Sequence, residues 1–311
     1  MIPFITRLEN SQKVLIAGCG GGFDVFAGVP RAQYLRARGK SVVFANFSFT
    51  NLWMCGGERI ASTLWRVDRQ SSELPYFPEK WLVEWLNRNE RAAPVYVFAK
   101  SGVVPLSSAY ELIIREHQVD LVVLVDGGTD SIIFGDEPGI GSAIEDAVSI
   151  VAVSRAAGER AVLAALGFGI DHYHGVSHHA FLENVARLTR DGDFLGAFSV
   201  QSGTPEADEF LDLIDYANQR QPVHRSIVCN SIASALRCEF GDYHATNRTS
   251  GNELFINPLM SQYWTFAVQG IAHHMGYANQ IVETDRFEDV KRVIELWRET
   301  VELRPHRQIP L

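Results

Sequence analysis

The stretch KVLIAGCGGGFDVFAGVP, at residues 13–30, decides the fold, because an apolar run leads through glycines into an amphipathic segment. Lys13–Ala17 predicts a buried strand. Apolar side chains at helical spacing predict a helix over Asp24–Arg38, which Gly39 would end. Ser41–Phe47 predicts a second strand. A strand, a glycine loop, a helix and a strand in this order are typical of a βαβ unit.

The same alternation continues along the chain. Apolar runs predict further strands at Val95–Ala99, Leu121–Val125, Ala161–Leu166 and Phe194–Val200. Helical spacing predicts helices at Leu106–His117, Ala143–Ala156, His178–Arg190, Glu209–Asn218, Gln262–Met275 and Phe287–Leu303, whereas Cys229–Arg237 fits either a helix or a strand.

We therefore expect an α/β protein with a Rossmann-like, mostly parallel sheet, helices on both faces and a helical C-terminal extension. Residues 1–311 would form a single domain, with a core over about residues 1–220 and a polar loop and helices over about residues 221–311. In such sheets, ligands lie outside the carboxyl ends of the strands.

Composition narrows the functional class. Hydrophobic residues make up 46% of the 311 residues and the formal charge is −9. An acidic chain is a poor match to the phosphate backbone, so nucleic acid is not an expected partner. The four cysteines form no C-x-x-C pair, and no secretory signal or long apolar run is present. We expect a cytoplasmic protein with a small-molecule ligand and no membrane partner, and a homo-oligomer stays open.

The first glycine loop, residues 18–24, is a candidate ligand site. Glycines let the backbone approach a ligand closely, and a following helix offers N–H groups to an anion. Phe23 stands where a dinucleotide motif has its third glycine, and Asn46, not an acid, ends the second strand. These departures argue against an NAD redox role. The expected ligand is a phosphate, nucleotide or sugar, and a ligand-free turn stays open. The candidate binding residues here are Gly20, Gly21, Gly22, Asp24 and Asn46.

A second glycine loop follows the strand Leu121–Val125. Asp126 and Asp130 are candidate catalytic acids or bases, or ligands of sugar hydroxyls or Mg²⁺, and a local turn is the alternative. If the two strands are neighbours, these carboxylates would converge with Asp24 in one crevice. The candidate binding residues of this loop are Gly127, Gly128, Thr129 and Ser131.

Histidines are concentrated in residues 171–179, DHYHGVSHH. His174 and then His178 are the candidates for proton transfer, because imidazole titrates near neutral pH. A transition-metal site, or merely exposed or capping histidines, are the alternatives. In the polar stretch that follows, Arg248 could close over a phosphate or carboxylate, since arginine binds such groups bidentately.

The chain resembles a known family. GCGGGFDVFAGVP, VDGGTDSIIFGDEPGIG, DHYHGVSHHAFLENVA and RTSGNELFINPLMSQYW together resemble the Rossmann-like proteins grouped as domain of unknown function 1152, over nearly the whole length. That family carries no assigned reaction. The resemblance implies that both glycine loops belong to one site.

These observations favour an enzyme that binds a nucleotide, nucleoside or sugar phosphate and performs glycosidic-bond hydrolysis or group transfer. Two alternatives belong to other classes. The first is a metabolite-binding sensor or regulatory subunit without chemistry. The second is a metal-dependent hydrolase built on residues His172–His179. The cofactor stays undetermined, with Mg²⁺ as one candidate.

Overall fold

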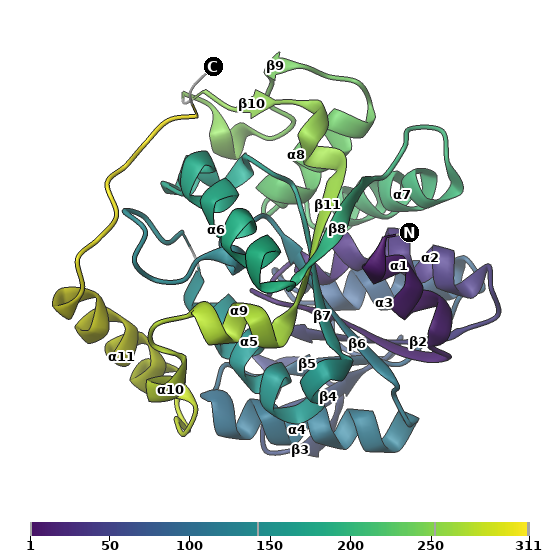
Figure 1. Ribbon diagram of the computed structural model, residues 1–311. Coiled ribbons are helices and arrows are strands. Elements are labelled where there is room, and N and C mark those ends of the chain that lie inside the picture. The colour runs from purple at the N-terminus through teal and green to yellow at the C-terminus, as the bar shows by residue number, and fades with distance from the viewer. Residues whose placement is uncertain (1, 142, 252, 310–311) are drawn as a thin grey trace.

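A computed structural model describes residues 2–141, 143–251 and 253–309. A nine-stranded sheet crosses the molecule, and helices cover both of its faces (Figure 1). Its strands are β1 (Lys13–Gly18), β2 (Ser41–Phe47), β3 (Glu58–Ala61), β4 (Leu64–Val67), β5 (Val95–Phe98), β6 (Leu121–Gly127), β7 (Ala161–Leu166), β8 (Phe194–Ser199) and β11 (Gln262–Ala267). Strands β9 (Gly241–Asp242) and β10 (Phe255–Ile256) form a separate hairpin.

The sheet order is β3-β4-β5-β2-β1-β6-β7-β11-β8. The strands β5, β2, β1, β6 and β7 are parallel, which confirms the expected α/β, Rossmann-like class. From β1 the chain first builds outward through β2 to β5, and then returns to place β6 on the other side of β1. The carboxyl ends of β1 and β6 therefore form the topological switch point, where ligands of such sheets bind.

The helices are α1 (Pro3–Asn10), α2 (Val29–Arg36), α3 (Pro78–Arg88), α4 (Val103–His117), α5 (Ala143–Ala157), α6 (His178–Asp191), α7 (Pro205–Arg220), α8 (Ile227–Leu236), α9 (Val268–His274), α10 (Ala278–Ile281) and α11 (Phe287–Thr300). No helix in the described part of the chain has the length and apolar character needed to span a lipid bilayer.

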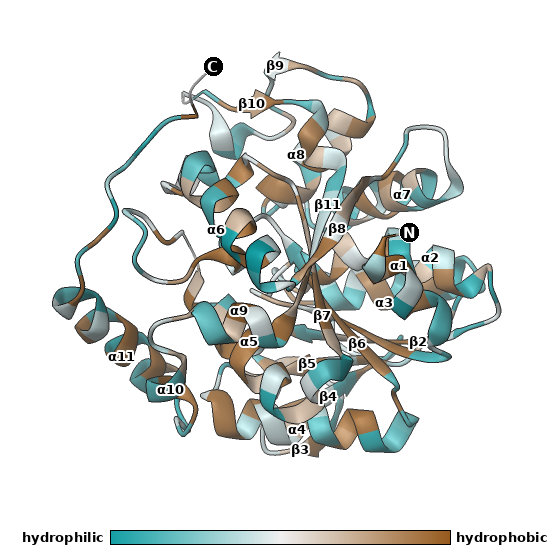
Figure 2. Ribbon diagram, viewed as in Figure 1, coloured by the Kyte–Doolittle hydropathy of each residue, from teal (hydrophilic) through white to brown (hydrophobic). Residues whose placement is uncertain are grey.

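Alternation along the central strands divides the core into two layers. Val14 and Ile16 of β1 belong to one buried cluster, and Leu15 and Ala17 belong to the other. Successive side chains of a strand point to opposite faces, so a fully apolar strand requires helices on both sides. Figure 2 shows these apolar strands in the interior and hydrophilic residues on the outer helices.

The prediction of one helix over Gln262–Met275 is wrong. Its first half is β11, an antiparallel strand between β7 and β8, and only its second half is α9. The run Tyr263–Phe266 consists of aromatic and β-branched residues, which favour a strand once neighbouring strands supply pairing. The helix expected over Asp24–Arg38 is also divided, into the 3-10 helix η1 (Asp24–Gly28) and α2.

Candidate functional site

The two glycine loops meet at the switch point. Gly18 of β1 pairs with Val125 of β6, so the segments that follow these strands emerge side by side. They border a cavity of about 200 Å³. The cavity is lined by Gly20, Gly21, Gly22, Phe23, Asp24, Phe49, Tyr76, Asp126, Gly127, Asp130, Asp146, Asp171, Ser226, Ile227, Val228, Cys229 and Arg248.

Five aspartates face this cavity. Carboxylate oxygens of Asp24, Asp126 and Asp146 lie within 4.8 Å of one another, close enough to share one cation. Asp130 and Asp171 line the same cavity. Asp24 is partly exposed in the pocket, and each of the other four is at most 3% exposed. The structure thus brings together Asp24, Asp126 and Asp130, which the sequence placed in one crevice. It adds Asp146 and Asp171.

The loop after β6 holds two of these carboxylates in place. Ser131 donates from both its backbone N–H and its hydroxyl to Asp126. Thr129 does the same for Asp171, which lies on the 3-10 helix η5 (Ile170–His174) after β7. The hydroxyls predicted to bind a ligand are therefore engaged in orienting the aspartates.

Two glycines make room for this cluster. Gly128 has a φ of +145°, and a Cβ there would lie 2.6 Å from Asp171 Oδ2. A Cβ on Gly20 would lie 2.8 Å from Asp146 Oδ2. Any other residue at Gly128 would combine backbone strain with a steric clash. Gly128 and Gly20 thus leave space for the carboxylates of Asp171 and Asp146, in addition to any space that they leave for a ligand.

The electrostatics of the cluster are unfavourable without a cation. Burial, followed by the negative charge of Asp130, raises the pKa values of Asp24, Asp126 and Asp146. In addition, Asp146 Oδ1 is buried and accepts no hydrogen bond within the described residues. Buried carboxylate oxygens are normally satisfied, and either a proton on this carboxyl or a bound cation would supply the missing partner. A bound cation would satisfy the oxygen and offset the repulsion.

Asn46 holds the first glycine loop by a hydrogen bond to its backbone. The Asn46 amide donates to Gly22 O at 2.7 Å and to Glu79 Oε1 at 2.8 Å. Burial raises the pKa of Glu79 to about 7. Asn46 is fully buried and is not among the residues that line the cavity. The loop N–H of Gly20 donates to Asp24 at 2.7 Å, so this amide is already occupied.

Other side chains form the rim of the cavity. Phe49 is 44% exposed beside the glycine loop, and the Tyr76 hydroxyl would lie 2.7 Å from a Cβ on Gly22. Arg248 reaches the same rim and donates to Arg225 O at 2.8 Å. Arg248 therefore lies beside the acidic cavity, and its expected role in binding a phosphate or carboxylate stays a prediction.

The histidines lie elsewhere. The rings of His172 and His178 stack at 5.0 Å and line a different cavity, on the other side of η5 from Asp171. Burial, followed by the charge of His172, lowers the pKa of His178. The side chain of His174 lies outside the described residues. Within the described part of the chain, the only group arranged to hold a metal is the aspartate trio.

Sequence reasoning missed Asp146, which lies in the first turn of α5. A signal was present, because the segment AIEDAVSIVAV is almost wholly apolar around it. An acidic side chain is rarely buried unless it has a polar partner or a ligand, so an acid within an apolar segment indicates one of the two. Asp171 was seen only as part of the histidine-rich stretch, and Tyr76 was not seen.

Comparison with known proteins identifies a family and nothing more specific. A family described as "Protein of unknown function (DUF1152)" matches residues 15–308. No curated protein and no solved structure matches the chain. Because the matched segment spans nearly the whole sequence and includes all five aspartates, the chain belongs to the DUF1152 family.

Proposed function

We propose that this protein is a divalent-cation-dependent enzyme that hydrolyses or transfers a group of a nucleotide or sugar phosphate. The observation that carries this proposal is the aspartate trio, in which the oxygens of Asp24, Asp126 and Asp146 lie within 4.8 Å. The buried and unbonded Asp146 Oδ1 supports it independently.

The donor set selects the kind of cation. Carboxylate oxygens are hard ligands that suit Mg²⁺, Mn²⁺ or Ca²⁺, whereas zinc and copper sites favour imidazole or thiolate. Cys19 and Cys229 are close, but burial raises the pKa of each thiol, which opposes the thiolate form that binds metals. Mg²⁺ or Mn²⁺ is the cation that we expect.

The charge of the cavity selects the substrate. Five carboxylates would repel a free anion, but a cation held by Asp24, Asp126 and Asp146 would offset that repulsion and supply positive charge for a phosphoryl group. Arg248 at the rim adds a second positive group for a phosphate. A cavity of about 200 Å³ admits a cation and a phosphate or sugar group, while the rest of a nucleotide would lie along the rim at Phe49 and Tyr76.

The chemistry would be divided among the aspartates. The trio would bind the cation, which polarises the reacting group and lowers the pKa of bound water. Asp130 and Asp171 line the cavity outside the trio. We assign to Asp130 the role of general base, as the sequence suggested for this loop, and to Asp171 that of orienting the substrate.

The test is a turnover assay on metal-stripped protein with nucleotides and sugar phosphates, with and without Mg²⁺ or Mn²⁺. We expect release of phosphate, base or sugar that depends on the cation and is abolished in Asp126→Asn without unfolding. Glu145→Gln is the matched control, since this neighbour of Asp146 pairs with Lys100 outside the cavity. Full activity in Asp126→Asn would refute the proposal.

The same assay addresses the alternatives. Tight, cation-dependent ligand binding without turnover of any substrate would favour the sensor or regulatory subunit. A hydrolase centred on residues His172–His179 would lose activity in His178→Ala and keep it in Asp126→Asn. We do not expect that outcome, because the grouping of metal-binding side chains within the described residues is the aspartate trio, and the rings of His172 and His178 stack on each other.

A further inference from the structure

A second cavity lies on the opposite side of η5 from the carboxylates. Its volume is about 490 Å³, within the range of small-molecule sites. Asp171 lines the first cavity and the next residue, His172, lines the second. The walls of the second cavity are Phe168, His172, Ser177, His178, Phe240, Phe255, Asn257, Pro258, Leu259, His306, Arg307, Gln308 and Ile309.

Two groups of flat rings contribute to this wall. In one group, His178 stacks on His172 at 5.0 Å and packs against Phe168 at 5.3 Å. In the other group, Phe240 and Phe255 meet edge to face at 5.3 Å. Aromatic rings attract other rings in stacked and edge-to-face geometries beyond the effect of burial alone.

The apolar side chains of this cavity remain exposed. Phe240 is 70% exposed, Phe255 is 50% exposed and Leu259 is 46% exposed. Single exposed apolar residues are ordinary, but three at the lip of one cavity form a contiguous apolar surface. Burial lowers the pKa of His178, which favours its neutral imidazole, and Arg307 is the one permanently charged side chain among the described residues of this wall.

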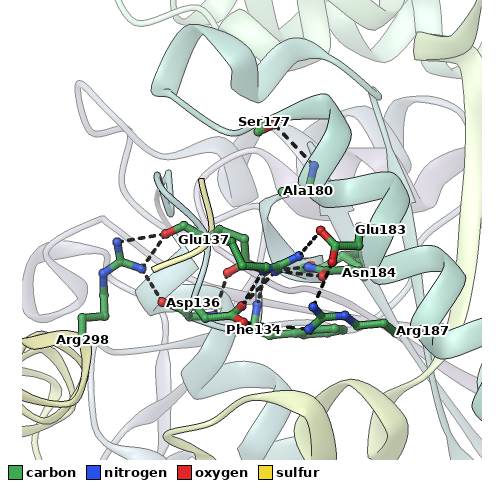
Figure 3. A network of polar contacts seen from close by, with 12 residues as sticks. Phe134, Asp136, Glu137, Ser177, Ala180, Glu183, Asn184, Arg187 and Arg298 are labelled. Carbon is green, nitrogen blue, oxygen red and sulfur yellow. Dashed lines mark hydrogen bonds and ion pairs between the residues drawn. The ribbon is translucent and has the colours of Figure 1, made fainter. Parts of the chain in front are cut away.

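The C-terminal segment closes the cavity and is firmly attached. Arg304 pairs with the buried Glu137 and with Glu183 of α6, and Ser177 donates to Arg307 O at 3.0 Å. Arg298 of α11 donates to the backbone of Glu137, as Figure 3 shows. The segment that carries the wall residues 306–309 is therefore attached to the rest of the domain at Arg304 and at the Arg307 carbonyl.

We propose that this cavity is a second binding site, which takes a neutral planar aromatic ring of the size of a nucleobase or indole. Its volume of about 490 Å³ has room for such a ring and for substituents on it. The ring would stack between the His172–His178 pair and the Phe240–Phe255 pair. This site is separate from the acidic cavity, so the proposal stands apart from the reaction assigned there.

The test uses adenosine and indole as probes of the full chain, followed by saturation-transfer NMR and titration. We expect saturable binding of at least one probe. Phe255→Ala should weaken it by about tenfold, the size expected for the loss of one stacked ring. Tyr243→Ala is the matched control, because this aromatic of the same polar stretch is 38% exposed and does not line the cavity.

Three outcomes would overturn the proposal. One is the absence of saturable binding of either probe. Another is equal affinity in Phe255→Ala and the parent protein. The third is loss of binding in Asp126→Asn, which would place the probe in the acidic cavity instead. Unchanged binding in Asp126→Asn, together with loss in Phe255→Ala and in His172→Ala, supports a separate aromatic site.

Discussion

Asp24 begins η1 beyond the carboxyl end of β1, Asp126 lies at the carboxyl end of the adjacent parallel strand β6, and their carboxylate oxygens lie within 4.8 Å of each other. Two like charges at this distance in a buried site repel strongly, so the arrangement costs stability unless protons or a cation neutralise it. Asp146 adds a third carboxylate from α5. The first three predictions follow from this crowding of charge and from the buried glutamate nearby.

Removing the charge of Asp146 should raise the stability of the metal-free protein and lower its affinity for Mg²⁺. In Asp146→Asn, we expect a higher Tm than in the parent protein when EDTA is present, because one buried like charge is gone. We also expect Mg²⁺ affinity to fall by about tenfold or more, about 1.4 kcal/mol of binding free energy. Thermal unfolding with and without Mg²⁺ measures both. A Tm that falls in EDTA would contradict the repulsion.

Stability of the metal-free protein should fall as the pH rises. The pKa values of Asp24, Asp126 and Asp146 are raised above the unfolded value of about 3.9. Between the unfolded and folded pKa values the native state binds more protons, so raising the pH through that window destabilises it. Mg²⁺ competes with these protons, so its stabilising effect should grow with pH. Urea titrations at several pH values, with Mg²⁺ or EDTA, test both slopes.

Glu79 should contribute a separate pH effect. Its pKa rises from 4.5 to about 7 on burial. Stability should therefore fall as the pH rises from 4.5 to 7 and level off above it. Glu79→Gln retains an acceptor for Asn46 and should stabilise the protein at pH 8, by at most ~3 kcal/mol. The gain should vanish at pH 4. An equal effect at both pH values would show that ionisation of Glu79 is not its cause.

Gly128 should tolerate no side chain. Gly128→Ala combines a φ of +145° with a Cβ that would lie 2.6 Å from Asp171. Gly175→Ala is the control, since its φ is +86° but nothing lies within 4 Å of the added Cβ. We expect Gly128→Ala to lose ~1–3 kcal/mol more than the control. Chemical denaturation compares the two, and equal losses would mean that backbone strain alone matters.

The C-terminal segment should depend on Arg304. In Arg304→Met, the fully buried Glu137 would lose its cationic partner, which should cost about 3 kcal/mol. Limited proteolysis should then cut within residues 301–309 faster than in the parent protein. Arg286→Gln is the control, because its pair with Glu288 is 73% exposed on both sides and should contribute little. Unchanged cleavage of Arg304→Met would show that other contacts hold the segment.

Much of the fold could be predicted because the strands that decide it are short apolar runs. β1, β2 and β7 match their predicted residues to within one position, since burial on both faces leaves a continuous apolar signal. β11 was mistaken for part of a helix, because its pairing with β7 and β8 comes from segments far away in the sequence. β3 and β4 were missed because each is only four residues long, and the edge strand β3 is largely exposed and carries little apolar pattern.

The site was predictable in part for a related reason. Asp126 lies at the carboxyl end of β6 and Asp24 ends the glycine loop after β1, so their position at the switch point comes from the local pattern. Asp146 lies within a helix, and only the packing of α5 against the sheet brings it to them. The ligand roles expected for Thr129 and Ser131 were inferred from residue type, whereas the structure uses both to orient carboxylates.

The most direct test of the central claim is isothermal titration calorimetry of metal-stripped protein with Mn²⁺, repeated in two buffers of different ionisation enthalpy. The account predicts saturable binding with release of protons, since carboxyls of raised pKa must ionise to bind the metal. It also predicts that Asp146→Asn weakens this binding by about tenfold or more and that Glu145→Gln keeps it. No saturable heat at millimolar Mn²⁺, or equal binding in Asp146→Asn, would contradict a cation site in the aspartate trio.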